Sequence, residues 1–203
     1  MNRIFVLLIL WVAVPAYAET PAILVFGDSI SAGYGLPRVE RGWVALLQAK
    51  LKTAGYGDEV VNASVSGETT AGGLARLPRA LNLHHPAVVV LELGGNDGLR
   101  ALPIEQMRAN LTRMVDLATG AGAKVLLLGM RIPPNYGPQY TEQFSAVYAD
   151  IARAKHVALV PFLLRDVALH PDLMQADGVH PVEAAQPLLL ATVWPTLEPL
   201  LKR

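Results

Sequence analysis

Residues 22–29 read Ala-Ile-Leu-Val-Phe-Gly-Asp-Ser, an apolar run followed by a sharp polar exit. A short apolar run bounded by turn residues is typical of a strand buried on both faces, as in a parallel sheet. Similar runs recur along the chain, separated by longer segments with helical periodicity, and this alternation predicts one doubly wound α/β sandwich. Strands are expected at 22–26, 59–63, 87–92, 124–129 and 158–161, and helices at 43–54, 70–82, 104–119, 140–155 and 182–200.

The C-terminal helix is the element with the least regular pattern. Pro181 is expected in its first turn, where a proline removes only an N–H that has no intrahelical partner. Pro187 and Pro195 are expected to kink or shorten the same helix. No internal repeat or long Gly/Ser linker divides the chain, so a single domain is predicted.

The N-terminal residues have the pattern of a secretory signal peptide. Arg3 gives a positive start, 6–14 is an uninterrupted apolar run, and Ala16-Tyr17-Ala18 fits a cleavage site with small residues. The run is well short of the roughly 20 residues that an uncleaved membrane-spanning helix needs, so no stable membrane anchor is expected. We therefore expect residues 1–18 to be removed, one domain at 19–203, and a periplasmic or secreted protein.

Charge and cysteine content exclude several classes of function. The 203-residue chain has 17 Lys plus Arg and 17 Asp plus Glu, so no positive excess favours binding to nucleic acid. It contains no cysteine, which excludes disulfides, thiolate metal sites, a cysteine nucleophile and a lipidated cysteine anchor.

The first candidate for chemistry is Ser29, which follows the first predicted strand in Gly27-Asp28-Ser29. Ligands of open α/β sheets bind outside the carboxyl ends of the strands, so a hydroxyl here is well placed for nucleophilic attack. Gly-Asp-Ser is also ordinary turn composition. The segment is not the G-x-S-x-G elbow of α/β-hydrolases, because Ser31 occupies the place of the last glycine.

A serine nucleophile needs a base, and His180 is the best candidate. It lies in Asp177-Gly178-Val179-His180, where the carboxylate could orient the imidazole and stabilise its charged form. An aspartate in this position is also common in turns and at helix starts. The other histidines lie at predicted helix ends or in a connection, where surface or capping roles are expected; they are His84, His85, His156 and His170.

Acyl transfer also needs hydrogen-bond donors for a developing oxyanion. Gly67 follows the second predicted strand and Asn96 the third, where a backbone N–H and a side-chain amide could join the backbone N–H of Ser29. Turn formation is the alternative for Asn96, because Gly-Gly-Asn-Asp is a strong turn sequence by itself.

Taken together, these residues resemble the SGNH, or GDSL-type, hydrolase family, named after Ser, Gly, Asn and His. The similarity covers FGDSISAGYG, VVNASVSGETTAGGLARLP, LELGGNDGLR, PPNYG and DGVHP, and it spans essentially the whole chain after residue 18. Ile30 replaces the leucine of the GDSL signature, a conservative change that leaves the proposed chemistry intact.

The resemblance implies a three-layer α/β/α sandwich with a five-stranded parallel, flavodoxin-like sheet. It implies hydrolysis of acyl esters, acyl thioesters and lysophospholipids through a Ser29 acyl-enzyme, with His180 as general base and acid and Asp177 as its orienting partner. Ser29, Gly67 and Asn96 would form the oxyanion hole. The acyl groove would include Leu99, Arg100 and Ile132. No metal or cofactor is expected, and we expect a monomer acting on small-molecule acyl substrates.

Three other functions are compatible with parts of the sequence. A carbohydrate or small-ester deacetylase of the same family would use the same residues. A metal-dependent phosphoesterase would use oxygen and nitrogen ligands, which here would be Asp28, Asn96, Asp97, Asp177 and His180. An anion-binding module would use Gly33-Tyr34-Gly35, but the chain lacks the phosphate-binding glycine motifs.

Overall fold

The structure is a computed structural model that describes residues 22–201, so the predicted signal peptide lies outside the described residues. At its centre is one parallel five-stranded sheet, with the strand order β2-β1-β3-β4-β5. The strands are β1 (Ala22–Gly27), β2 (Glu59–Asn62), β3 (Val88–Glu92), β4 (Lys124–Leu128) and β5 (Ala158–Val160). This order is the flavodoxin-like one and confirms the predicted fold.

The middle strands of the sheet form the core because both of their faces are covered. Ile23 to Phe26 in β1 and Val88 to Leu91 in β3 are at most 1% exposed, which explains their uninterrupted apolar sequence. In the register between these strands, Gly27 pairs with Glu92. The end of β1 therefore lies beside the only charged residue of β3, at the carboxyl edge of the sheet.

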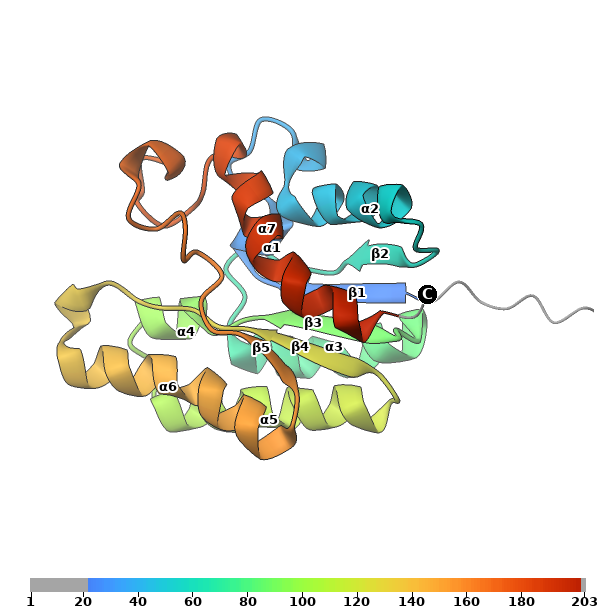
Figure 1. Ribbon diagram of the computed structural model, residues 1–203. Helices are drawn as coiled ribbons and strands as arrows, with labels where there is room; N and C mark the ends of the chain where they lie inside the picture. The colour runs from blue at the N-terminus through green and yellow to red at the C-terminus, as the bar shows by residue number, and fades with distance from the viewer. Residues whose placement is uncertain (1–21, 202–203) are drawn as a thin grey trace, which may run out of the picture.

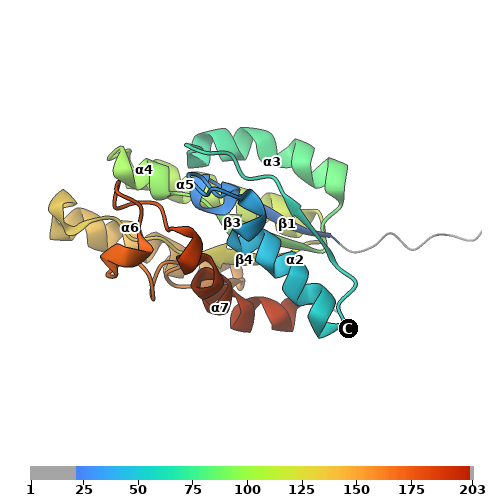
Figure 2. The same cartoon turned by 90° about the horizontal axis from the view of Figure 1, so that it is seen from above.

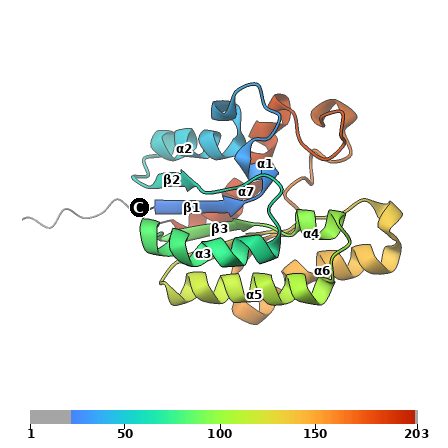
Figure 3. The ribbon, with the colours of Figure 1, turned by 180° about the vertical axis from the view of Figure 1, so that it is seen from behind.

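Helices cover both faces of the sheet and give the molecule three layers (Figures 1 and 3). On one face lie α2 (Trp43–Ala54) and α7 (Gln186–Leu197), packed against each other, as the view from above also shows (Figure 2). On the other face lie α3 (Thr70–His84), α5 (Ile104–Gly120) and α6 (Pro138–Lys155). The shorter elements are α1 (Ser29–Ala32), α4 (Gly95–Leu99), η1 (Val39–Arg41), η2 (Pro134–Tyr136), η3 (Pro171–Leu173), η4 (Glu183–Ala185) and η5 (Glu198–Leu200).

The prediction for the start of the last helix was wrong. Pro181 forms an isolated antiparallel bridge with Met174, and a 3₁₀ turn, η4, comes before the helix. Helix α7 begins at Gln186, and Pro187 is the proline of its first turn, while Pro195 is accommodated inside it. Both Pro181 and Pro187 could start a helix by their local chemistry, and tertiary pairing of the segment around Pro181 decided between them.

The other expected helices and strands are present, with ends that differ by at most two residues. His85 and His156 take left-handed backbone conformations at the C-caps of α3 and α6, with φ values of 39° and 53°. The capping role expected for these two histidines is confirmed.

Candidate active site

Ser29 is the first residue of α1, and only Asp28 separates it from the buried end of β1. The Asp28 side chain caps this short helix by accepting a hydrogen bond from the Ile30 backbone N–H at 3.1 Å. Gly27 is required for the close approach of β1 to β3, because a Cβ there would lie 2.6 Å from Glu92 Oε2. The local fold thus presents the Ser29 hydroxyl at the carboxyl edge of the sheet.

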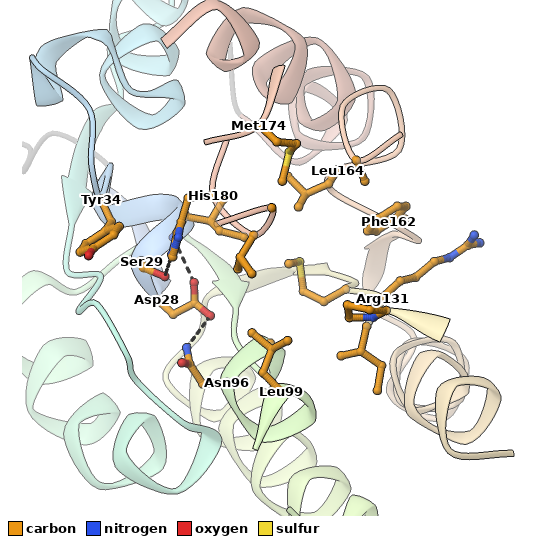
Figure 4. A pocket seen from close by; sticks show the side chains of 18 of the residues that line it. Asp28, Ser29, Tyr34, Asn96, Leu99, Arg131, Phe162, Leu164, Met174 and His180 are labelled. Atoms are coloured by element: carbon orange, nitrogen blue, oxygen red, sulfur yellow. Dashed lines mark hydrogen bonds between the residues drawn. The ribbon is translucent and has the colours of Figure 1, made fainter. Parts of the chain in front are cut away.

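The structure brings Ser29, Asp177 and His180 together as a hydrogen-bonded chain. His180 Nε2 lies 2.8 Å from Ser29 Oγ (Figure 4), and His180 Nδ1 lies 2.7 Å from Asp177 Oδ2. The Tyr34 ring lies against the imidazole, with ring centroids 4.6 Å apart. With Nδ1 donating to the carboxylate, Nε2 is the acceptor for the serine proton, which is the geometry of a serine–histidine–aspartate triad.

Asp177 is held ionised by its local turn. Desolvation opposes its charge, but hydrogen bonds from the backbone and ring of His180 and from the Val179 backbone outweigh it and lower the pKa of Asp177 to about 2. The two backbone bonds reach Oδ1 at 2.9 and 3.0 Å. Asp177 therefore stays a carboxylate at any pH at which the enzyme would work, which favours the tautomer that the triad needs.

The three proposed oxyanion donors lie in the wall of the same cavity, which includes Ser29, Gly67 and Asn96. The Asn96 amide nitrogen donates to Asp28 Oδ2 at 3.1 Å (Figure 4). This bond fixes which end of the amide carries the hydrogens, so the second N–H of Asn96 is left for another acceptor. Gly67 has a φ of 77°, a left-handed conformation that favours glycine.

Asn96 lies in the first turn of the short helix α4 rather than in an isolated turn. The neighbouring Asp97 anchors this helix by accepting bonds from the Thr70 backbone N–H at 2.8 Å and from the Thr70 hydroxyl at 2.6 Å. Asn110 donates to the same hydroxyl at 3.1 Å. In the Gly-Gly-Asn-Asp sequence, Asn96 therefore faces the cavity, whereas Asp97 stabilises the fold through its hydrogen bonds to Thr70.

Two buried carboxyl groups, those of Asp28 and Glu92, lie next to the segment that carries Ser29. Glu92 Oε2 accepts bonds from the Ser31 hydroxyl at 2.7 Å and from the Asp28 backbone N–H at 3.2 Å. Burial and the nearby charge of Asp28 raise the pKa of Glu92 well above its usual value. Burial also raises the pKa of Asp28 to about 6, against the opposing hydrogen bonds from Ile30 and Asn96.

These shifts predict a stability that falls as pH rises. The pKa of Asp28 is 3.8 without burial and about 6 in the folded chain, so the folded state binds the proton more tightly. The proton on Asp28 therefore contributes on the order of 3 kcal/mol to the free energy of unfolding. This contribution is fully present below about pH 4 and is lost between about pH 4 and 6. Urea unfolding of the parent and Asp28→Asn from pH 4 to 8 tests it. Relative to the parent, Asp28→Asn should gain free energy of unfolding as the pH rises to about 6, and the difference should then level off. A difference that does not change with pH would contradict a cost of burying the ionised Asp28 carboxylate.

Ser29, Asn96 and His180 line a cavity of about 700 Å³. Its apolar walls come from α4 and from the loops after β4 and β5, and they include Leu99, Met130, Ile132, Phe162, Leu164 and Met174 (Figure 4). Leu99 and Ile132 thus line the space proposed for the acyl group. Arg100 lies outside this lining, and its guanidinium donates to the Gly67 carbonyl at 3.0 Å.

The sequence reasoning missed the part of the cavity that follows β5. Phe162, Leu164 and Met174 belong to none of the motifs, and they are far in sequence from Leu99 and Ile132, the lining residues that were expected. One available signal was their place directly after a predicted strand, because the loops at the carboxyl edge all border the binding site of such a sheet. Asp28 and Glu92 were also not recognised as a pair.

A parallel 2-1-3-4-5 sheet, with a serine after its first strand that is hydrogen-bonded to a histidine from the C-terminal part of the chain, is the arrangement of SGNH-type acylhydrolases. The model of the GDSL-like Lipase/Acylhydrolase family matches residues 25–186, and the chain belongs to this family. It is therefore an ester-hydrolysing enzyme.

Its sequence is 57% identical over 184 residues to Esterase TesA of Pseudomonas aeruginosa, covering 91% of each chain. It is 42% identical to thioesterase 1/protease 1/lysophospholipase L1 of Escherichia coli K12, covering 97% of this chain and 91% of that one. A crystal structure of TesA superimposes with a TM-score of 0.87 at 58% identity, covering 89% of this chain and 99% of that one.

Proposed function

We propose that the protein hydrolyses acyl esters and acyl thioesters through an acyl-enzyme on Ser29. The observation that carries this proposal is the unbroken chain of Asp177, His180 and Ser29, with 2.7 and 2.8 Å between the bonded atoms, at the wall of an apolar cavity. The names of the relatives, an esterase and a thioesterase/lysophospholipase, support both substrate classes.

In the first half of the reaction, Ser29 Oγ attacks the acyl carbonyl carbon while His180 Nε2 takes the hydroxyl proton. The carbonyl oxygen becomes an oxyanion, which the backbone N–H groups of Ser29 and Gly67 and the Asn96 amide stabilise. When the C–O or C–S bond breaks, His180 delivers the proton to the leaving alcohol or thiol. Water then loses a proton to His180 and attacks the acyl carbon. The bond between this carbon and Ser29 Oγ breaks, the carboxylic acid is released, and His180 returns the proton to Ser29 Oγ.

The apolar cavity favours medium or long acyl chains over acetyl. Each additional buried methylene contributes up to about 0.8 kcal/mol, roughly fourfold in kcat/KM, until the cavity is full. We therefore expect kcat/KM to rise from acetyl to longer chains in matched panels of oxygen esters and thioesters. Ala168 lines the cavity and is only partly buried, so Ala168→Trp should lower the ratio of long-chain to short-chain kcat/KM. Acetyl esters as the best substrates would instead identify a deacetylase.

The metal-dependent alternative has less support from the geometry. Among residues 22–201, no group of three or more His, Asp or Glu side chains is arranged to hold a metal ion. The Asp97 carboxylate accepts two bonds from Thr70, and Asp97 does not line the cavity. Full activity in a chelator, with loss of activity when a phosphonate ester modifies Ser29, would support the serine mechanism. Loss of activity in the chelator, restored by a divalent metal, would favour the alternative.

We also propose that residues 1–18 are a cleaved signal peptide and that the enzyme at 19–203 acts as a periplasmic or secreted monomer. The sequence pattern of the first residues supports export, and one chain supplies all of the proposed catalytic groups. None of the helices within residues 22–201 is long and apolar enough to cross a membrane. Intact mass of the exported protein, which should begin at Glu19, and light scattering after gel filtration test these points.

A further inference from the structure

The segment that carries Asp177 and His180 has little regular secondary structure. Between β5 and η4 it contains only the short turn η3. A narrow antiparallel pairing shapes it, in which Met174 bridges Pro181 and the Val182 N–H donates to the Leu173 carbonyl at 2.9 Å. Such a segment needs fixed points if the imidazole is to stay within hydrogen-bond distance of the serine.

Gln175 supplies several of these fixed points. Its backbone N–H donates to the His180 carbonyl at 2.7 Å, and its own carbonyl accepts from the Gly178 N–H at 2.9 Å. These two backbone hydrogen bonds close the turn that contains Asp177. The turn ends at His180, the proposed base.

The Gln175 side chain extends this link to the segment of the nucleophile. Its Nε2 donates to the Pro181 carbonyl at 3.1 Å and to the Tyr34 carbonyl at 2.9 Å, so one amide group joins segments 141 residues apart. The Tyr34 N–H in turn donates to the Ser29 carbonyl at 3.0 Å. In this series of hydrogen bonds, Tyr34 is the one residue between Gln175 and Ser29.

The backbone next to Tyr34 leaves room for this amide. Gly35 has a φ of 71°, and a Cβ at this position would overlap the Gln175 side-chain amide. Glycine therefore meets two requirements at once, the left-handed backbone and the close approach of Gln175.

We propose that Gln175 is a positioning residue that sets the separation between His180 Nε2 and Ser29 Oγ by joining the two segments that carry them. It acts through Tyr34 and His180 and does not line the cavity. This inference rests on the proposed triad. Because a shift of about 1 Å in a catalytic group can cost about 100-fold in rate, loss of the side-chain bonds should lower kcat without weakening substrate binding.

The test compares Gln175→Ala with a matched control, Gln48→Ala. Gln48 also bridges two backbone groups, donating to the Asp58 carbonyl at 3.3 Å and accepting from the Val60 N–H at 2.7 Å, but at the opposite edge of the sheet. Gln175→Ala should lower kcat about 10- to 100-fold with little change in KM. Gln48→Ala should lower the melting temperature to a similar extent and leave kcat near the parental value.

Gly35→Ala tests the same contact from the other side. It should lower kcat in the parent and lower it less in the Gln175→Ala background, where the contact is already lost and only the strain of the left-handed backbone remains. If Gln175→Ala fails to fold, Gln175→Met takes its place in the comparison with Gly35→Ala. Methionine keeps the length of the side chain and removes the amide donors. A kcat within twofold of the parent, an equal loss in Gln48→Ala, or additive effects with Gly35→Ala would overturn the inference. Failure of a phosphonate to label Ser29 in the parent would instead overturn the proposed function.

Discussion

Ser29→Ala is expected to lower kcat by about 10⁴-fold or more, because the acyl-enzyme cannot form without the hydroxyl. The fold should be unaffected. Ser29 is only partly buried, and its hydroxyl bonds to His180 rather than to any element of the core. The melting temperature should therefore stay close to that of the parent. Steady-state kinetics with a chromogenic ester measure kcat. Intact-mass spectrometry after treatment with a phosphonate ester detects modification of Ser29.

His180→Gln provides the matching control for the triad. Groups that act as a unit are not additive, so the double variant Ser29→Ala/His180→Gln should be no slower than the worse single variant. His156→Gln, at the end of α6, should retain most activity. Phosphonate labelling of another serine in Ser29→Ala, or an active His180→Gln, would remove these residues from the mechanism.

The sheet was predictable because its signal is local. The buried runs in β1 and β3 are covered on both faces, so each strand is recognisable from its own few residues. The helices α1 and α4 were not predicted, because four or five residues are too few to show a helical period. Both carry proposed catalytic residues, since Ser29 and Asn96 lie in their first turns.

The proposed triad and oxyanion residues were identifiable because each lies in a motif next to a strand or turn. The residues that hold them were not, because their partners are distant in sequence. Glu92 bonds to the Asp28 N–H across 64 positions and Gln175 to Tyr34 across 141. The glutamate that ends an otherwise apolar strand was the one local indication of a polar network behind the nucleophile.

Asn96→Ala is expected to have the next largest effect, and it tests whether the oxyanion hole includes a side-chain donor. The charge on the substrate oxygen is full only in the tetrahedral intermediate, so the Asn96 amide should stabilise the transition state more than the bound substrate. Its loss should lower kcat on the order of 100- to 1000-fold, or roughly 3 to 4 kcal/mol, with little change in KM.

Two further substitutions at Asn96 separate chemistry from structure. Asn96→Asp should be at least as harmful as Asn96→Ala, because it removes the donor and places a second carboxylate beside Asp28 Oδ2, to which the amide now donates at 3.1 Å. Asn96→Gly keeps the backbone freedom of a turn but supplies no donor. If Asn96 served only the turn, Asn96→Gly would restore much of the activity that Asn96→Ala loses.

The neighbouring Asp97 gives a control for damage to α4 itself. Asp97→Ala removes both bonds to Thr70, so it should lower the melting temperature more than Asn96→Ala does and change KM together with kcat. Measurement of kcat, KM and melting temperature for all four variants gives each role its own pattern. A near-parental kcat in Asn96→Gly, or a melting temperature in Asn96→Ala as low as that of Asp97→Ala, would assign Asn96 to the fold. A loss confined to kcat in the Ala, Asp and Gly variants would assign the Asn96 amide to the developing oxyanion.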